Sequence, residues 1–300
     1  MSKPSHQPPT VVAVVVTHNR LALLKENLAA LRGQTRTPEE IIVVNNGSTD
    51  GTAEWLATQP DLTVIQEKNV GPGGGQSAGI KTAYTKGYDW FWCMDDDAIP
   101  DRDALEQHLK SSKASDERTG FLYSFVRWTD GSVCLMTAPN VHPDYSTLVE
   151  LLPQGLLRLD SASWNSILFH RRAVAKIGLP LREMFFWFED VEYTRRISNN
   201  FLCYQVLASK AEHRSKTNRW VNFDKLAELP ADFLQNALRN FIFLRRWQAP
   251  SKAIGWFRCV KSALRMQWRV WRQIPGMNKW PLSAAIWRGV VFHPKIEMPE

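Results

Sequence analysis

The sequence predicts an α/β fold, with a Rossmann-like, mostly parallel sheet that carries helices on both faces, followed by a basic helical extension. Two observations predict this arrangement. Short apolar runs rich in β-branched residues alternate with helical patterns between residues 11 and 94, which is typical of a parallel sheet covered by helices. The composition then changes towards the C-terminus. We therefore expect a disordered lead at 1–10, an α/β domain at 11–215 and a helical C-terminal region at 216–300.

The individual elements follow from periodicity. Residues 11–16 read VVAVVV, a continuous apolar run that suits a strand buried on both faces. Leucines at spacings of three and four, from Leu21 to Leu31, predict a helix that ends before Pro38. Further strands are expected at 41–44, 62–66, 90–94, 166–169 and 203–207, and further helices at 53–58, 80–86, 101–110, 172–177 and 189–198. Short strands and loops are expected between 121 and 160.

Composition excludes several classes of protein. Hydrophobic residues make up 44% of the chain and charged residues 22%, values too ordinary for wholesale disorder. The N-terminus lacks the apolar segment of a signal peptide, and no later run has transmembrane length. The four cysteines are widely spaced without a CxxC pair, which favours reduced, packed thiols. We therefore expect a cytoplasmic protein, soluble or peripheral on the inner face of a membrane.

Polar clusters follow three of the expected strands. They are Thr17 to Arg20, Asn45 to Asp50, and Asp95 to Asp97. Ligands of parallel α/β sheets bind beyond the carboxyl ends of the strands, so these clusters predict a nucleotide site. The three adjacent aspartates repel one another and call for a cation, and Mg²⁺ or Mn²⁺ prefers such oxygen ligands. A solvated acidic turn that caps the next helix is the alternative.

Two further segments carry candidate chemistry. In FFWFEDVEYTRR (185–196), Glu189, Glu192 and Arg196 share a helix face, so ion pairing is the structural alternative for both glutamates. Asp190 follows an aromatic wall, and burial there would raise its pKa towards that of a general base. The glycine-rich segment 69–79 matches neither a P-loop nor a clean dinucleotide fingerprint, and we expect it to approach a ligand or to form a flexible loop.

In this order, the motifs VVTHNR, IIVVNNGSTDGT, GPGGG and DDD resemble the family-2 glycosyltransferases of the GT-A fold. The later segments WNSILFHRRAVAKIGLP and FFWFEDVEYTRRI resemble the branch with bacterial galactofuranosyltransferases and rhamnosyltransferases. The resemblance covers about residues 11–215. Together the motifs are specific, although each one alone is weak.

The resemblance implies a role for each matching residue. The donor-binding residues would be Thr17, Arg20, Asn46, Asp50, Asn69, Gly74, Asp95 and Asp96. The metal ligands for Mn²⁺ or Mg²⁺ would be Asp95, Asp97 and His213, and Asp190 would be the catalytic base. Trp164, Trp187 and Glu189 would contact the acceptor, although the aromatics can equally be core residues. Asn45 or Asn46 stands where many relatives carry aspartate, Ser77 where they often carry asparagine, and Glu189 where some carry aspartate.

The resemblance also implies the reaction. A sugar, galactofuranose from UDP-galactofuranose in the favoured interpretation, would pass with inversion to a hydroxyl of a glycan or lipid-linked acceptor of the cell envelope. A rhamnosyltransferase that uses dTDP-rhamnose is the alternative within the same fold. A nucleotidyltransferase or an inactive sugar-nucleotide-binding module is more distant, because neither would need the segment at 185–190 together with His213.

The C-terminal region has a charge pattern of its own. Between Phe233 and Lys295 there are twelve Lys or Arg and no Asp or Glu, so subtracting them from the total of +7 leaves −5 elsewhere. From residue 257 to residue 272, an apolar aromatic stripe at helical spacing runs beside a basic stripe one residue later. This pattern suits an anionic membrane surface. Packing on the catalytic domain and oligomer contacts are alternatives, whereas the sequence contains no recognisable nucleic-acid module.

Overall fold

The computed structural model describes residues 8–219, 226, 231–274 and 278–300, so residues 1–7 of the expected lead lie outside the described part. The strands are β1 (Val11–Thr17), β2 (Glu40–Asn46), β3 (Leu62–Glu67), β4 (Trp90–Asp95), β5 (Ala98–Pro100), β6 (Thr119–Trp128), β7 (Asn140–Val141), β8 (Leu156–Ser161), β9 (Ile167–His170) and β10 (Leu202–His213). The helices are α1 (Leu21–Arg32), α2 (Thr52–Leu56), α3 (Gly71–Thr85), α4 (Ala104–Lys110), α5 (Tyr145–Leu151), α6 (Arg171–Ile177), α7 (Glu189–Ser198), α8 (Ala231–Trp247), α9 (Lys252–Gln273) and α10 (Trp280–Val291), with short 3₁₀ turns η1 (Leu152–Gln154) and η2 (Arg182–Met184).

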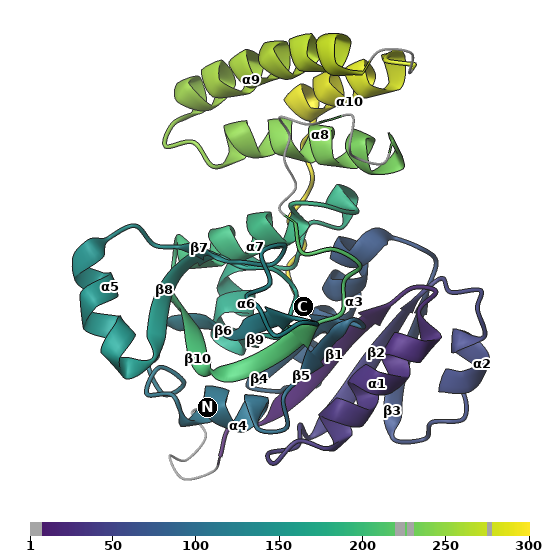
Figure 1. Ribbon diagram of the computed structural model, residues 1–300, viewed down its shortest axis with the longest axis vertical. Helices are drawn as coiled ribbons and strands as arrows, with labels where there is room; N and C mark the ends of the chain where they lie inside the picture. Colours follow the sequence, from purple (N-terminus) through teal and green to yellow (C-terminus); the bar gives the residue numbers. More distant parts are fainter. Residues whose placement is uncertain (1–7, 220–225, 227–230, 275–277) are drawn as a thin grey trace.

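The predicted α/β fold is confirmed, and its parallel part coincides with the regular alternation of strands and helices (Figure 1). Neighbouring strands in the order β3-β2-β1-β4 are parallel throughout. Beyond β4 the sheet is mixed, because β9 runs antiparallel to both β4 and β6 while β10 runs parallel to β6. The short strand β5, which the sequence did not predict, pairs antiparallel with β10.

The central strand β1 shows why its sequence is apolar at every position. Successive side chains of a strand point to opposite faces of the sheet. Val12 and Val14 pack into one hydrophobic cluster with residues of α3, and Val11 and Val15 pack into a second cluster with Leu24 of α1. Both faces of β1 are thus covered, which is the condition under which a parallel strand loses its polar alternation.

The glycine-rich segment forms the first half of a helix, so the expectation of a loop before a helix at 80–86 is wrong. Helix α3 already begins at Gly71. A Cβ atom at Gly75 would lie 2.7 Å from Val16 Cγ1, and one at Gly79 would lie 2.3 Å from Val14 Cγ1. These glycines therefore let the helix approach β1 more closely than any larger residue allows, and this packing outweighs the low helix propensity of glycine.

Strand β10 extends well past the predicted end at residue 207. Its register against β6 shifts between Val206 and Lys210, and the strand then continues to His213. The shift interrupts the apolar pattern, which is why the sequence indicates only the first half of the strand. Its continuation pairs His213 with Ala98 of β5 and so brings the histidine beside the end of β4.

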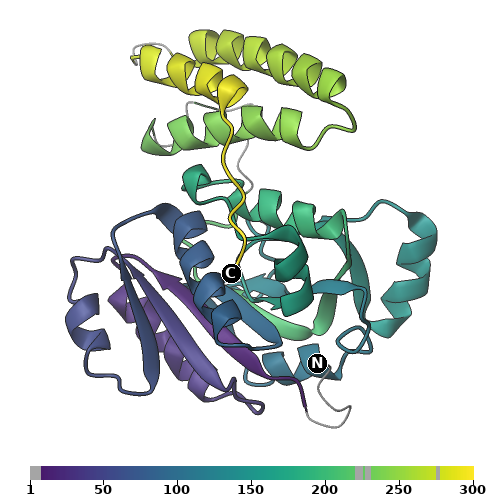
Figure 2. The same cartoon turned by 180° about the vertical axis from the view of Figure 1, so that it is seen from behind.

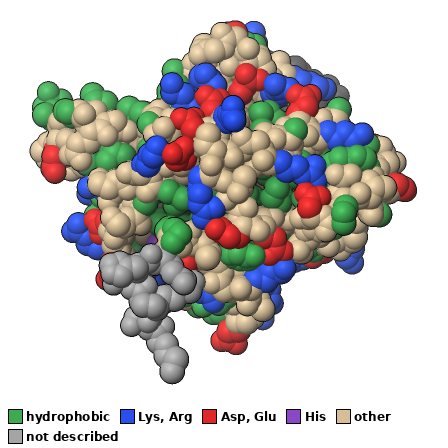
Figure 3. All heavy atoms as spheres, turned by 90° about the horizontal axis from the view of Figure 1, so that it is seen from below, with side chains coloured by type: hydrophobic (Ala, Val, Ile, Leu, Met, Phe, Trp, Pro, Cys, Tyr) green, Lys and Arg blue, Asp and Glu red, His purple; other side chains and the backbone are tan. Residues whose placement is uncertain are grey.

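Helices α8, α9 and α10 pack on one another around a separate hydrophobic cluster and lie beyond the sheet on one side (Figure 1). The amphipathic pattern at 257–272 falls within α9. After α10 the chain runs back to the body of the protein, where Leu179 N donates to Glu297 O at 2.8 Å (Figure 2). On the face seen from below, opposite these helices, basic and acidic side chains are interspersed (Figure 3). Among the described helices, none combines the length and apolar character needed to cross a bilayer.

Candidate active site

The polar clusters predicted at three strand ends lie at one edge of the sheet. In the parallel register, Thr17 of β1 is paired with Asn45 of β2, and Val16 is paired with Asp95 of β4. The residues that follow each strand therefore emerge beside one another. This juxtaposition is a direct consequence of parallel topology, because the carboxyl ends of neighbouring strands meet at the same edge.

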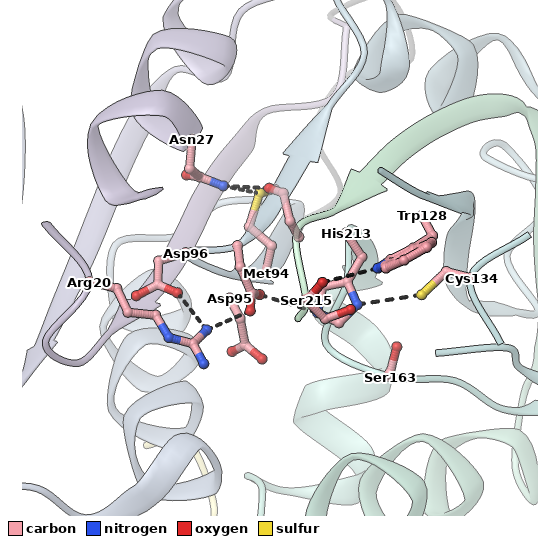
Figure 4. Close-up of polar contacts among 12 residues, drawn as sticks. Arg20, Asn27, Met94, Asp95, Asp96, Trp128, Cys134, Ser163, His213 and Ser215 are labelled. Atoms are coloured by element: carbon pink, nitrogen blue, oxygen red, sulfur yellow. Dashed lines mark hydrogen bonds and ion pairs between the residues drawn. The ribbon is translucent and has the colours of Figure 1, made fainter. Parts of the chain in front are cut away.

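The aspartates after β4 are held by residues from the end of β1. Thr17 Oγ1 donates to Asp96 Oδ2 at 2.7 Å. Arg20 Nη1 donates to Asp97 Oδ2 and lies 3.3 Å from Asp96 Oδ1 (Figure 4). Asp96 and Asp97 are buried, whereas half of the Arg20 side chain is exposed. Arg20 is thus an accessible cation that already contacts two of the three carboxylates.

The three carboxyl groups differ in acidity. Burial, together with the charges of Asp97 and Asp96, raises the pKa of Asp95 to about 7. Burial also raises the pKa of Asp96 to about 6, although Arg20 opposes this shift. Burial acts in the same direction on Asp97, but contacts with His213 and Arg20 lower its pKa overall. Asp97 is therefore the carboxylate that keeps its negative charge most firmly.

His213 occupies the last position of β10 and faces the acidic cluster. Its Nε2 lies 3.4 Å from Asp97 Oδ1, and its Nδ1 lies 3.4 Å from Cys134 Sγ (Figure 4). Burial opposes protonation of the imidazole, but the hydrogen bonds to Asp97 and Cys134 raise the pKa of His213 to about 9. A metal ion bound through Nε2 would have to displace this proton.

These donors fit a divalent cation. The Asp97 carboxylate and the His213 imidazole face each other, and both are common ligands of Mn²⁺. Across the described residues, no group of three or more His, Cys, Asp or Glu side chains is arranged to hold a metal ion. The structure therefore brings together two of the three predicted ligands and does not add Asp95 to them.

Two residues predicted to bind the nucleotide also connect elements of the protein. Asn46 is buried, and its Oδ1 accepts from Val70 N at 2.9 Å, which ties β2 to the start of α3. Asp50 accepts from Leu21 N at 3.1 Å and from Thr52 N at 3.2 Å, at the first residues of α1 and α2. The hydroxyl of Thr52 is the main cause that lowers the pKa of Asp50.

The remaining donor-side residues divide into accessible and buried ones. Asn69 is exposed, and its Nδ2 lies 3.3 Å from His18 Nε2. Gly74, in contrast, is buried within α3, where a Cβ would lie 2.6 Å from Val70 Cγ2. The close approach of Val70 explains why a glycine occurs here, and the predicted donor contact of Gly74 stays a prediction.

The segment before α7 has an unusual backbone. Phe185, Trp187 and Phe188 have φ angles of 62°, 72° and 68°, a region that side chains with a Cβ rarely adopt. Helix α7 then begins at Glu189. Non-glycine residues in this region are strained, and such strain clusters at functional sites.

Glu189 and Asp190 differ in burial. Glu189 is buried, its Oε2 has no hydrogen-bond partner in the described part of the chain, and its Cγ would lie 2.9 Å from a Cβ at Gly73. Burial and the neighbouring Asp190 charge raise the pKa of Glu189 well above its usual range. Asp190 is partly exposed, and burial raises its pKa to about 6. The carboxyl of Asp190 can therefore accept a proton near neutral pH.

The two tryptophans expected at the acceptor are packed against other aromatic rings. Trp164 is buried in the core, with its ring 6.0 Å from Phe169 and 5.8 Å from Tyr193, so its predicted stacking on a sugar is corrected to a core role. Trp187 is partly buried and meets Phe233 of α8 edge to face at 4.3 Å. The predicted ion pair between Glu192 and Arg196 forms at 2.8 Å.

Some residues near the site carry no signal in the sequence. Cys134 contacts His213, but a single cysteine outside any motif predicts nothing about its neighbours.

An open cavity of about 580 Å³ is lined in part by Asn69. Its lining residues are Asn69, Val70, Arg182, Glu183, Phe185, Asn236 and Arg239. None of the strand-end aspartates lines this cavity, so it is separate from the acidic cluster.

Comparison with known proteins agrees with this geometry. The model of glycosyl transferase family 2 matches residues 12–134. Galactofuranosyltransferase GlfT1 of Mycobacterium tuberculosis is 32% identical over 205 residues, which are 63% of this chain and 64% of the relative. The protein of that name from Mycolicibacterium smegmatis is 30% identical over 203 residues, or 62% and 65% of the two chains. The chain thus spans less than two thirds of these curated relatives.

Solved structures share the fold at low sequence identity. GalNAc-T7 with UDP, GalNAc and Mn²⁺ aligns at a TM-score of 0.63 and 14% identity, over 95% of this chain and 55% of that one. A mannosyltransferase from Pyrobaculum calidifontis with GDP-Man and Mn²⁺ aligns at 0.52 and 15% identity, over 95% and 87%. These similarities support the GT-A arrangement of the sheet. Residues 12–134 therefore match glycosyl transferase family 2, in a chain of the GT-A fold that is similar to galactofuranosyltransferase GlfT1.

Proposed function

We propose that this protein is an inverting, metal-dependent glycosyltransferase that moves galactofuranose from UDP-galactofuranose to a hydroxyl of a glycan or lipid-linked acceptor in cell-envelope synthesis. The observation that carries the proposal is the pairing of Asp97 with His213 at the strand ends, in a chain that also presents Asp190 with a raised pKa. Similarity to galactofuranosyltransferase GlfT1 supports the choice of donor sugar. The aligned structures hold UDP or GDP-Man together with Mn²⁺, which supports the general chemistry.

In this proposal, Asp97 and His213 would hold Mn²⁺ or Mg²⁺, and Asp95 and Asp96 would lie beside them. When bound, the cation supplies positive charge that stabilises the leaving diphosphate. Arg20 adds a second positive group at the same place, because its guanidinium already lies against Asp96 and Asp97 and remains half exposed. Arg20 and the bound cation would thus both lie at the strand ends, where the negative charge of the leaving group would develop.

Asp190 would remove the proton from the acceptor hydroxyl. A general base works best when its pKa lies near the operating pH, and burial brings the Asp190 carboxyl to about 6. Burial raises the pKa of the adjacent Glu189 well above its usual range, which favours the negative charge of the pair on Asp190. Attack by the acceptor oxygen on the face opposite the diphosphate would invert the anomeric carbon.

The test is transfer by the purified protein with Mn²⁺ and a panel of sugar nucleotides that includes UDP-galactofuranose and dTDP-rhamnose. A rhamnose-terminated lipid mimic serves as the acceptor, and mass spectrometry detects the product. We expect transfer from UDP-galactofuranose, with loss in Asp190→Asn and retention in the surface control Asp61→Asn. Transfer from dTDP-rhamnose alone would mean that dTDP-rhamnose, and not UDP-galactofuranose, is the donor. Release of nucleotide from every donor without a glycoside product would refute the transferase assignment.

A further inference from the structure

Helix α9 presents an exposed row of large apolar side chains. The row consists of Phe257, Val260, Leu264, Trp268 and Trp271. The buried residues of the same helix, which include Cys259, Ala263 and Met266, belong to the cluster formed with α8 and α10. At 3.6 residues per turn the two sets lie on roughly opposite sides of the helix. The apolar row therefore faces away from the rest of the protein, and α9 lies on the outer side of the helical unit (Figure 2).

A basic row runs along one flank of these apolar side chains. It consists of Arg258, Lys261, Arg265, Arg269 and Arg272. The segment from Phe233 to Lys295 contains twelve Lys or Arg and no Asp or Glu. The face below the sheet, by contrast, mixes acidic and basic side chains (Figure 3). The outer surface of α9 is thus both apolar and strongly cationic.

Tryptophans extend this surface onto α10. The rings of Trp271 and Trp280 lie 6.1 Å apart at 88°, and Trp280 is 72% exposed. Arg272 lies 4.9 Å from the ring of Trp268, and Lys279 lies 5.3 Å from that of Trp271. Tryptophan is favoured where one end of a ring contacts lipid and the other contacts water.

We propose that this surface docks on a membrane that contains anionic lipids, with α9 parallel to the membrane plane. Exposed aromatic and aliphatic residues would enter the boundary between head groups and acyl chains, while the flanking arginines contact the negative head groups. A second copy of the chain fits less well, because two such basic rows would repel each other. A nucleic acid would match the charge but would leave Leu264 and Val260 without an apolar partner.

Vesicle flotation of the full chain tests this proposal, and its result does not depend on transferase activity. We expect binding to phosphatidylcholine vesicles that contain phosphatidylglycerol, and little binding to phosphatidylcholine alone. Each basic residue near an anionic surface contributes about fivefold to binding, so Lys261→Glu with Arg265→Glu should weaken it by at least about 25-fold. Leu264→Ala with Trp268→Ala should also release the protein from vesicles.

Controls on the sheet domain should bind as the wild type does. Tyr145→Ala removes a 75% exposed aromatic, and Lys110→Glu reverses an exposed charge. Equal binding by the α9 variants and these controls would overturn the proposal, and so would absence of binding to anionic vesicles. If the protein binds an oligonucleotide in preference to vesicles, the α9 surface would be assigned to nucleic acid. If it forms a dimer that Trp268→Ala dissociates, the surface would be assigned to a second copy of the chain.

A different observation concerns the strained segment before Asp190, and this inference rests on the proposed function. Asn240 of α8 is fully buried. Its Nδ2 lies 2.8 Å from Met184 O, 3.1 Å from Phe186 O and 2.7 Å from Trp187 O. The neighbouring Arg239 donates from Nη2 to Met184 O at 2.8 Å. One amide group thus faces three carbonyls of a segment whose backbone angles are otherwise unfavourable.

The same helix also contacts α7 beyond the catalytic position. Trp247 Nε1 donates to Glu192 Oε1 at 2.9 Å, and Arg195 donates to Gln248 just after α8 at 3.2 Å. Helix α8 therefore holds the chain on both sides of Asp190. We infer that Asn240 is a positioning residue, which fixes the backbone at 184–187 and thereby the direction in which Asp190 points.

Asn240→Asp tests the inference, because it keeps the shape of the side chain and replaces the donor by a group that repels carbonyl oxygens. We expect kcat to fall at least about tenfold, with UDP affinity by calorimetry and the KM for the donor unchanged. Asn278→Asp, the same change at an exposed position before α10, should keep the wild-type kcat. Arg239→Gln, which removes the adjacent donor, should lower kcat in the same direction if Asn240→Asp does not fold.

The outcomes separate this inference from the proposed function. Absence of transfer in the wild type would refute the proposed function. Wild-type transfer with an unchanged kcat in folded Asn240→Asp would refute the positioning role alone. A loss of thermal stability with normal kcat would reduce Asn240 to a structural residue.

Discussion

The acidity of Asp190 gives a quantitative prediction about the pH dependence of transfer. Its pKa of about 6 results from burial behind the aromatic segment, which disfavours the charged carboxylate. A base must be deprotonated to act, so kcat/KM should fall as the pH decreases through this value. With a pKa of about 6, about nine tenths of the carboxyl is ionised at pH 7 and about one tenth at pH 5.

The assay is initial-rate transfer from pH 4.5 to pH 8.5 at saturating Mn²⁺ and constant ionic strength. We expect a plateau above about pH 7 and a tenfold decrease per unit well below pH 6. Asp190→Asn should lower kcat by about 10²–10⁴-fold, the usual contribution of a general base, and should remove the acidic limb. UDP binding at each pH controls for loss of the donor site.

Two results would refute this reasoning. An inflection near pH 4 with normal UDP binding would mean that the base is an unperturbed carboxyl, so the burial of Asp190 would not matter for catalysis. Retention of the acidic limb in Asp190→Asn would assign the titration to another group. In either case the aromatic segment would keep a packing role only.

Three further predictions concern the metal and the packing. Chelation by EDTA should abolish transfer, and Mn²⁺ should restore it. His213→Ala should raise the Mn²⁺ concentration that is needed for the half-maximal rate. Full activity in EDTA would exclude the roles given to Asp97 and His213. Gly79→Ala should lower the free energy of unfolding by about 1–3 kcal/mol in urea titrations, because its Cβ would overlap Val14, and unchanged stability would mean that α3 moves freely. Trp164→Ala should cost about 3–5 kcal/mol of unfolding free energy as a core truncation, whereas lower acceptor affinity at unchanged stability would restore its predicted acceptor role.

The strand-end site could be predicted because its geometry follows from local pattern and topology. Apolar runs such as 11–16 identify buried strands, and parallel pairing forces the residues after them to one edge. The contact between Arg20 and the aspartates then needs only that adjacency. Position along the chain was sufficient to place Arg20 and the aspartates, because both groups closely follow a predicted strand.

The residues that sequence reasoning misplaced depend on tertiary packing instead. Glycine disfavours helices, yet Gly75 and Gly79 lie within α3 because their missing side chains allow close contact with β1. The direction of Trp164 depends on packing against Phe169 and Tyr193, which no local pattern specifies. The role of Asn240 is equally hidden, because helical spacing does not reveal which distant carbonyls a polar residue meets.

The acidic site itself argues that these residues are kept for chemistry rather than stability. Three carboxyls, of which Asp96 and Asp97 are buried, lie beside two positively charged groups, Arg20 and His213, so the cluster is short of positive charge. The raised pKa values of Asp95 and Asp96 are the result of burial under this shortage. Apolar side chains of similar volume often stabilise a fold more than buried charges do. Such a cluster lowers stability and needs additional positive charge. It is best explained by a ligand that brings cations to the site.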